Sequence, residues 1–453
     1  MKEKKSPPIS GGKAVVECLK AHKIKYVFGL IGSAAMELFD ALYDEENIKF
    51  IDVRDERTGT HMADAYARAS GKHGVIVAGQ NGPGATNLVT GVAQAKAAFS
   101  PLLSIAGAIS TEHHGKDAFQ EVDQQKLFEP ITKKTISIKD TKSITADLNK
   151  AIHLTTQGKK GPVHVNIPRD VLAKLESFDS FKDEKTTKIT SIDQKDIEKI
   201  ISLLQQSSKP VIICGAGIKN TLTQNKVITL SKYLNIPIVS SAGHGDVIPF
   251  NYDLYAGQMG PRGNKVASSL VKNADLILAL GTRLGFNSTF YSYDNISESA
   301  KIVQIDIDPV AIGRYFPIEI GINNDVKIFL ENFEFSIKNK VDKNNFKKWV
   351  NSFLIDKHLY YKKRDENADV DSKLIQPSGL FKELRNIMPK NSSVTLDAGT
   401  LCLQATDEFN FFEPRSLFTP LDFGLVGFSF AAGLGVKLAK TESPVFSLMG
   451  DGG

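Results

Sequence analysis

A chain of 453 residues with a formal net charge of +5 is longer than a single hydrophobic core usually supports, so its length predicts two or three domains. Its apolar share of 42% excludes a disordered chain, and its three cysteines exclude a disulfide-rich secreted scaffold. The lysines are scattered rather than clustered, which argues against a nucleic-acid-binding protein. No stretch approaches the roughly 18 apolar residues of a membrane helix, so we expect no membrane span and a cytoplasmic location.

Residues 9–174 alternate between helical patterns and short apolar strands. The helical spacing of Ala14, Cys18 and His22 precedes the first predicted strand. The predicted strands are 26–29, 50–53, 75–79, 102–107 and 163–168, and the helix around Met62 and Tyr66 ends near Gly71. Nearly continuous apolar strands that alternate with helices are typical of a parallel sheet covered on both faces. We therefore predict an α/β domain with a doubly wound parallel sheet over 9–174.

Two further α/β units follow. The polar, lysine-rich segment 175–194 predicts a linker, and strands at 211–214, 236–239, 276–280 and 302–306 predict a Rossmann-like domain over 194–335. Gly215, Gly217 and Asp306 lie at strand ends, where open parallel sheets bind nucleotides. The charged stretch 338–373 separates a third unit, 374–453.

A short internal repeat links the first and third units. Residues 443–450 (SPVFSLMG) resemble residues 100–107 (SPLLSIAG), and in both places a helical segment of small residues comes first. The repeat suggests that the two units share a fold, although one match of this length also arises by chance.

Three motifs could carry chemistry. In Gly79-Gln80-Asn81-Gly82-Pro83-Gly84, a strand meets a helix whose free N–H groups could bind a ligand, although the motif also suits an ordinary tight turn. Glu56 follows a strand at the carboxyl edge of the sheet, but it could equally serve the helix dipole or pair with Arg54 or Arg57. Gly450-Asp451-Gly452 places a carboxylate after an apolar strand, either as a ligand of a hard cation or as a plain loop.

Taken together and in this order, the motifs resemble the acetolactate synthase-like branch of thiamine-diphosphate enzymes. The resemblance extends over nearly the whole chain. It also rests on Phe28-Gly29, Asp117-Ala118-Phe119-Gln120-Glu121, Gly161-Pro162-Val163, Pro414-Arg415-Ser416 and Gly427-Phe428. It implies three α/β domains: a pyrimidine-binding domain (9–174), a central domain (194–335) and a diphosphate-binding domain (374–453) that is incomplete after Gly453.

The resemblance also implies roles for individual residues. Glu56 would hydrogen-bond the cofactor's aminopyrimidine and promote formation of the thiazolium ylid. Gly424 would offer its carbonyl to the exocyclic amine, and Val426, where such synthases commonly have methionine, would hold the bent cofactor. The remaining implied site residues are Phe119 and Gln120, which line the reaction space; Gly82, Pro83 and Asn87, which bind cofactor; and Gly450, Asp451 and Gly452, of which Asp451 binds Mg²⁺.

The reaction and the partners stay open between related alternatives. The substrate is a 2-oxo acid if the chain acts like acetolactate synthase, or a sulfonated aldehyde if it acts like sulfoacetaldehyde acetyltransferase. A 2-oxo-acid decarboxylase and a non-catalytic cofactor-binding relative are further alternatives, whereas a nicotinamide oxidoreductase is disfavoured because Gly215-Ala216-Gly217 lacks the third glycine of its fingerprint.

Cofactor content and assembly follow from the same resemblance. Gly215, Gly217 and Asp306 would suit the ADP part of FAD, but the residues after Arg283 lack the arginine- and aspartate-rich string of FAD-binding synthases. A homodimer or homotetramer is expected, because the family builds its active site between subunits. The remaining metal ligands are expected beyond Gly453, so the 453-residue chain by itself is predicted to be inactive.

Overall fold

The computed structural model describes residues 7–181, 191–368, 373–420 and 422–453. By its contacts the chain forms two compact units. Unit 1 comprises 1–187 and 427–442, and unit 2 comprises 188–426 and 443–453. Part of the predicted linker, 182–190, lies outside the described residues, whereas Leu175–Glu176 (β8) pairs with Ile9–Ser10 (β1) in a small antiparallel sheet.

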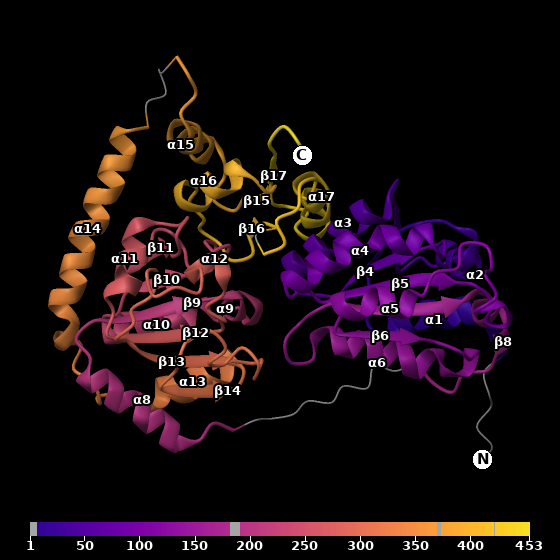
Figure 1. Ribbon diagram of the computed structural model, residues 1–453, viewed down its shortest axis with the longest axis horizontal. Coiled ribbons are helices and arrows are strands. Elements are labelled where there is room, and N and C mark those ends of the chain that lie inside the picture. Colours follow the sequence, from indigo (N-terminus) through magenta and orange to yellow (C-terminus); the bar gives the residue numbers. More distant parts are fainter. Residues whose placement is uncertain (1–6, 182–190, 369–372, 421) are drawn as a thin grey trace. The chain divides into compact units, whose positions relative to one another are not determined.

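Unit 1 contains a six-stranded parallel sheet with the strand order β3-β2-β4-β5-β7-β6. Figure 1 labels β4, β5 and β6 of this sheet. The strands are β2 (Tyr26–Leu30), β3 (Lys49–Asp52), β4 (Gly74–Ala78), β5 (Leu102–Ala108), β6 (Lys134–Ser137) and β7 (Val163–Pro168). The helices are α1 (Gly11–Ala21), α2 (Met36–Tyr43), α3 (Glu56–Ser70), α4 (Pro83–Ala97), α5 (Gln124–Phe128), α6 (Ile144–Thr156), α7 (Arg169–Ala173) and α17 (Ser429–Ala439).

Both faces of this sheet are buried, which confirms the prediction of a doubly wound domain. Val75 and Val77 of β4 pack in one core with helices α1, α2 and α6, while Ile76 and Ala78 pack in the other with α3, α4 and α17. Alternating side chains of a single strand therefore serve two apolar cores. The predicted helix end at Gly71 is also confirmed, since Gly71 caps α3 in the left-handed conformation with φ of 73°.

Helix α17 belongs to unit 1 although it lies near the end of the chain. It packs on α3 so closely that an added Cβ on Gly435 would lie 2.1 Å from the carbonyl oxygen of Met62. Its small side chains, among them Ala431 and Ala432, are buried in this contact. Glycine at position 435 is therefore required by the close approach of two helix backbones.

Unit 2 contains two parallel sheets. The larger has the order β11-β10-β9-β12-β13-β14, with β9 (Pro210–Cys214), β10 (Ile238–Ser240), β11 (Tyr255–Gln258), β12 (Leu276–Leu280), β13 (Lys301–Asp306) and β14 (Ile320–Asn323). The smaller has the order β16-β15-β17, with β15 (Ser393–Leu396), β16 (Leu417–Phe418) and β17 (Val445–Leu448). Strand β10 begins two residues later than predicted, after Pro237, which has no N–H to donate to a strand ladder.

Nine further helices complete unit 2 within the described residues. They are α8 (Gln194–Gln206), α9 (Ala216–Thr221), α10 (Gln224–Leu234), α11 (Lys265–Asn273), α12 (Phe286–Thr289), α13 (Val326–Ser336), α14 (Lys347–Glu366), α15 (Pro377–Ile387) and α16 (Thr400–Glu408). Helix α14 occupies much of the charged stretch 338–373, for which the sequence predicts no element. It is fixed at its start by Trp349, whose indole Nε1 donates to the carbonyl oxygen of Pro210 at 3.1 Å.

The three parallel sheets lie within the three predicted ranges, whose boundaries remain predictions. Both halves of the sequence repeat form parallel strands, β5 and β17, and a helix precedes each of them.

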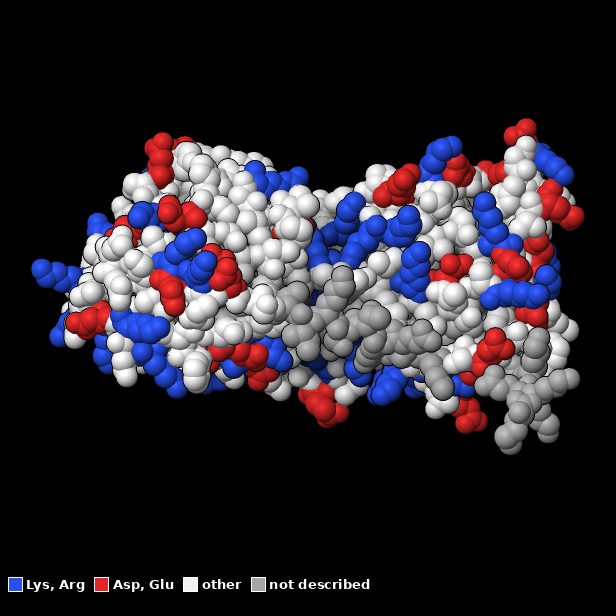
Figure 2. All heavy atoms as spheres, turned by 90° about the horizontal axis from the view of Figure 1, so that it is seen from below, with Lys and Arg blue, Asp and Glu red and all other residues white. Residues whose placement is uncertain are grey.

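On the face seen in Figure 2, Lys and Arg side chains lie among Asp and Glu side chains, which places much of the lysine content on the surface. The three cysteines are buried and free. Among the described residues, the structure has no helix long and apolar enough to cross a membrane.

Candidate functional site

Glu56 begins helix α3 immediately beyond strand β3. Asp55 caps the helix by accepting a hydrogen bond from the Thr58 amide at 3.1 Å, so the chain turns just before Glu56. The Glu56 side chain is only 3% exposed, and its Oε2 accepts a hydrogen bond from Asn87 Nδ2 at 3.0 Å. The Glu56 carboxyl group is therefore buried and bound to a neutral amide, whereas a carboxylate in a surface ion pair is exposed and bound to a cation.

The two arginines beside Glu56 have other partners. Arg54 forms an ion pair with Asp52, and Arg57 lies 3.9 Å from Asp55. Among the described residues, Glu56 therefore forms no ion pair with Arg54 or Arg57, which was the alternative that the sequence left open. The Oε1 atom of Glu56 accepts no hydrogen bond from a described residue, which leaves it open to a ligand.

The glycine-rich turn between β4 and α4 lies against Glu56. Gly82 has φ of +53° and an added Cβ would lie 2.6 Å from the carbonyl oxygen of Gln120, while Pro83 starts α4. An added Cβ on Gly84 would lie 3.1 Å from Glu56 Oε1. The turn thus needs glycine at Gly82 for its backbone conformation and at Gly84 for space beside the carboxylate.

The loop between β5 and α5 is attached to this turn by side chains. Asn81 Nδ2 donates to the carbonyl oxygens of Gln120 at 2.9 Å and Phe119 at 3.3 Å, and Gln80 Nε2 donates to Gln120 Oε1. Gln120 is held at φ of +62°, and Phe119 is 84% exposed. The structure therefore brings together Glu56, Asn87, Gly82, Pro83, Phe119 and Gln120. It also assigns positions to Gln80 and Asn81, which sequence reasoning left without a role although both are polar residues inside a buried turn.

A second group of predicted site residues lies in unit 2, where β15 and β17 are parallel neighbours. The segments that follow these strands, 397–399 and 450–452, therefore leave the same edge of the sheet. Gly399 has φ of +113° and precedes α16, and Asp397 is 2% exposed. Sequence reasoning missed the 397–399 turn, whose signal was a glycine between a strand and a helix.

The backbone around this edge is open. An added Cβ on Gly399, Gly424 or Gly450 would meet no heavy atom within 4 Å, whereas one on Gly452 would lie 3.2 Å from Val426 Cγ1. Gly424 has φ of +72°, and Val426 is 51% exposed. The structure thus places Val426 beside Gly452, and Gly399, Gly424 and Gly450 each have open space where a side chain would lie.

The described residues give little support for a metal site or a nucleotide site. No group of three or more His, Cys, Asp or Glu side chains there is close enough to hold a metal ion. In the central sheet, an added Cβ on Gly215 would lie 2.3 Å from the Gly281 carbonyl oxygen, and one on Gly217 would lie 2.7 Å from Gly281 Cα. These two glycines therefore serve close backbone packing. Arg283 pairs with Asp422 at 3.2 Å.

Three family models match the chain. They describe the N-terminal TPP binding domain (residues 9–127), the central domain (197–333) and the C-terminal TPP binding domain (397–453) of thiamine pyrophosphate enzymes. The third match extends to the last residue, and the incompleteness of the third domain after Gly453 stays a prediction.

The similar proteins include acetolactate synthase large subunits and a sulfoacetaldehyde acetyltransferase. A probable acetolactate synthase large subunit from Methanococcus aeolicus is 32% identical over 460 residues, and the alignment covers 98% of this chain and 76% of that protein. An acetolactate synthase large subunit from Cyanidium caldarium is 33% identical, with 98% and 76% covered. A sulfoacetaldehyde acetyltransferase from Alcaligenes xylosoxydans is 29% identical, with 97% and 76% covered.

Proposed function

We propose that this chain, which belongs to the family of thiamine pyrophosphate enzymes, transfers a two-carbon acyl unit from a 2-oxo acid to a carbonyl acceptor in the manner of an acetolactate synthase. In that reaction the bond between C1 and C2 of the donor breaks with loss of CO₂, and a new carbon–carbon bond forms to the acceptor carbonyl. The observation that carries the proposal is the buried Glu56 carboxylate held by Asn87 beside a glycine turn.

Glu56 is suited to hold a proton. Thiamine diphosphate supplies, when bound, a carbon nucleophile that adds to carbonyl substrates. Asn87 fixes Oε2, and the glycine at position 84 leaves Oε1 clear, so Oε1 is the atom that would exchange a proton with the aminopyrimidine. Phe119 and Gln120 would then border the substrate.

The open backbone of unit 2 would hold the diphosphate. Gly450 and Gly424 have space where a side chain would be, and the helix N-terminus at Thr400 offers unpaired N–H groups to an anion. We propose that Asp451 binds Mg²⁺, because this ion takes one or two carboxylates and completes its shell with phosphate oxygens and water. Val426 would support the bound cofactor from the side of Gly452.

FAD is not part of the proposal. Gly215 and Gly217 are already explained by their packing on Gly281, so they do not require a nucleotide. A measurement of bound flavin by absorbance on the purified protein tests this point, and stoichiometric flavin would contradict it.

We further propose a homodimer or homotetramer in which each active site takes Glu56 from one subunit and Asp451 from another. Mixing a Glu56→Gln variant with an Asp451→Asn variant tests the arrangement. Hybrid assemblies should regain part of the activity that each variant lacks by itself. If the hybrids stay as inactive as their parents, both residues act within one subunit or the assembly differs.

The substrate is tested by two assays on the same preparation of the natural full-length protein, supplied with thiamine diphosphate and Mg²⁺. Acetolactate formation from pyruvate is expected to exceed sulfite release from sulfoacetaldehyde. The reverse result would favour the second candidate function, which the similarity to a sulfoacetaldehyde acetyltransferase supports. A preparation inactive in both assays would contradict the proposal if cofactor binding, measured by calorimetry, is intact.

A further inference from the structure

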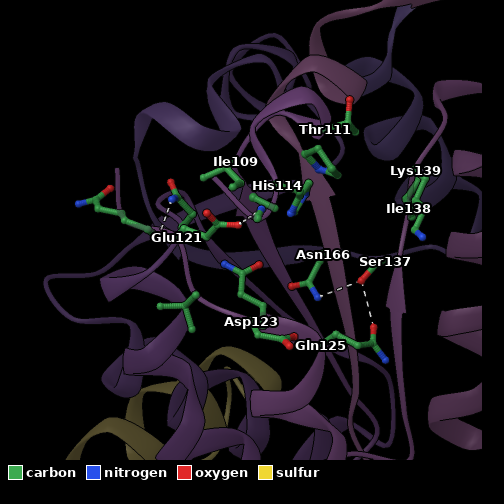
Figure 3. Close-up of a pocket in the computed structure, with 17 residues that line it drawn as sticks. Ile109, Thr111, His114, Glu121, Asp123, Gln125, Ser137, Ile138, Lys139 and Asn166 are labelled. Carbon is green, nitrogen blue, oxygen red and sulfur yellow. Dashed lines mark hydrogen bonds between the residues drawn. The ribbon is translucent and has the colours of Figure 1, made fainter. Parts of the chain in front are cut away.

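A cavity of about 760 Å³ lies in unit 1 where strands β5, β6 and β7 end (Figure 3). Ala108, Ser137 and Pro168, the last residues of these strands, all line it. Its other wall is the loop before α5, including Gln120. The cavity therefore adjoins the loop that carries two of the predicted site residues.

A chain of buried hydrogen bonds leads to this cavity from the core. Ser104 Oγ lies 3.0 Å from His164 Nδ1, and His164 Nε2 lies 2.7 Å from Asn166 Oδ1. Burial lowers the pKa of His164 to about 3, so the imidazole is neutral at physiological pH. Because Asn166 Oδ1 can only accept, Nε2 carries the hydrogen and Nδ1 accepts from Ser104.

The chain continues into the cavity wall in the same direction. Asn166 Nδ2 donates to Ser137 Oγ at 3.4 Å, and Ser137 Oγ donates to Gln125 Oε1 at 3.0 Å, as the dashed lines in Figure 3 show. Because Gln125 Oε1 accepts the last of these hydrogen bonds, the Gln125 NH₂ group is the donor at the end of the hydrogen-bond series. This NH₂ group has no acceptor among the described residues. Hydrogen bonds that run in one direction polarise each other, which favours an acceptor at the end.

The charged groups of the cavity also favour an acceptor. Lys139 lines it and has no carboxylate within 4.0 Å in the described part of the chain. The two carboxylates of the lining are already engaged. Glu121 accepts from the Gly115 and Ala118 amides at 2.6 and 3.1 Å, and Asp123 pairs with Lys126 at 2.7 Å. Among the described groups of the lining, the Gln125 NH₂ group and Lys139 remain as donors, and Gln124 Oε1 remains as a buried acceptor.

We propose that this cavity binds a small organic anion, a carboxylate or a sulfonate with a short aliphatic body. Gln125 and Lys139 would bind the anionic head, since a charge-assisted hydrogen bond is stronger than a neutral one. The side chains of Ile109, Ile138 and Pro168, which also line the cavity, would contact the aliphatic body. The proposal concerns binding and holds whichever substrate the enzyme uses.

Calorimetric titration of the full chain with propanoate, propane-1-sulfonate and the neutral propanamide tests the proposal. The two anions should bind and propanamide should not. Lys139→Gln should weaken anion binding about tenfold, which is the size of one charge-assisted hydrogen bond. The matched control is Lys134→Gln. Lys134 lies on β6 and is exposed, as Lys139 is, but it does not line the cavity. The Lys134→Gln variant should therefore bind the anions as the wild type does.

The hydrogen-bonded wall has its own test. Ser137→Ala removes the hydroxyl that orients Gln125 and should weaken binding about threefold, whereas Ser137→Thr keeps a hydroxyl and should restore it. Equal binding of propanamide and propanoate, or equal losses in the two lysine variants, would overturn the assignment. If inorganic phosphate binds more tightly than both organic anions, the claim that the ligand has an aliphatic body is wrong. If the folded protein gives no heat of binding with either organic anion, the proposed site is wrong.

Discussion

The two groups of predicted site residues are built in opposite ways. In unit 1, Glu56 and the 79–84 turn are fixed by side chains, with Asn87 on the carboxylate and Asn81 on the neighbouring loop. In unit 2, the residues around Gly424 and Gly450 make room through missing side chains. A group that moves a proton needs one fixed geometry, whereas a group that binds an anion needs exposed backbone. The following changes test this difference, beginning with the largest effect.

Replacing Glu56 with Gln should lower turnover by about 1000-fold, because the amide cannot exchange a proton although it can still accept from Asn87. Unfolding free energy should change by less than about 0.5 kcal/mol, since the hydrogen bond to Asn87 persists. Steady-state kinetics and urea unfolding measure the two effects. The exposed Asp52→Asn variant is the control, and a loss of activity in proportion to a loss of stability would assign Glu56 a structural role only.

Replacing Gly82 with Ala should cost about 3 kcal/mol of unfolding free energy. The new Cβ would meet the Gln120 carbonyl oxygen at 2.6 Å, and the backbone is already at positive φ. Denaturant unfolding gives the free energy. Hydrogen exchange in residues 109–123 should rise at the same time, and unchanged exchange would show that the loop is held independently of the turn.

Acid should destabilise unit 1 through His164. The pKa of this histidine falls from its ordinary 6.5 to about 3 in the folded protein, because burial disfavours the charged form. The unfolded chain therefore binds the proton first as pH falls. The contribution to stability is complete above about pH 6.5 and is lost progressively toward pH 3.

Between pH 7 and pH 5 this single group should remove about 2 kcal/mol of unfolding free energy. The measurement is a comparison of wild type with His164→Gln at both pH values, because all other titrations cancel in the difference. Identical pH dependence of the two proteins would mean that His164 is not neutral and buried in solution.

Replacing Gly424 with Ala should have the smallest effect, about 1 kcal/mol, because positive φ is its only cost and no atom lies within 4 Å of the new Cβ. Thermal unfolding measures it. The comparison of the two regions fails if this variant loses as much stability as Gly82→Ala. An accompanying loss of affinity for thiamine diphosphate would support the role of this backbone in binding.

Local patterns predicted most of the fold. Continuous apolar strands and their glycine ends located the sheets, and the glycine turn beside Glu56 was visible because both lie close to strand ends. The attachment of Gln120 to Gln80 and Asn81 was not predictable, since about 40 residues separate the partners and nothing local specifies the pairing. Helix α14 was missed because its surface is mostly charged, and few of its side chains, such as Val350 and Phe353, are buried.

The position of α17 on α3 was equally invisible in sequence, and it has a consequence for synthesis. The surface of α3 that includes Met62 cannot be covered until residues 429–439 have left the ribosome, after most of the chain has been made. At typical rates of translation this delay lasts roughly 20 to 70 seconds. During that time the first unit of a nascent chain leaves uncovered the surface of α3 that α17 later covers.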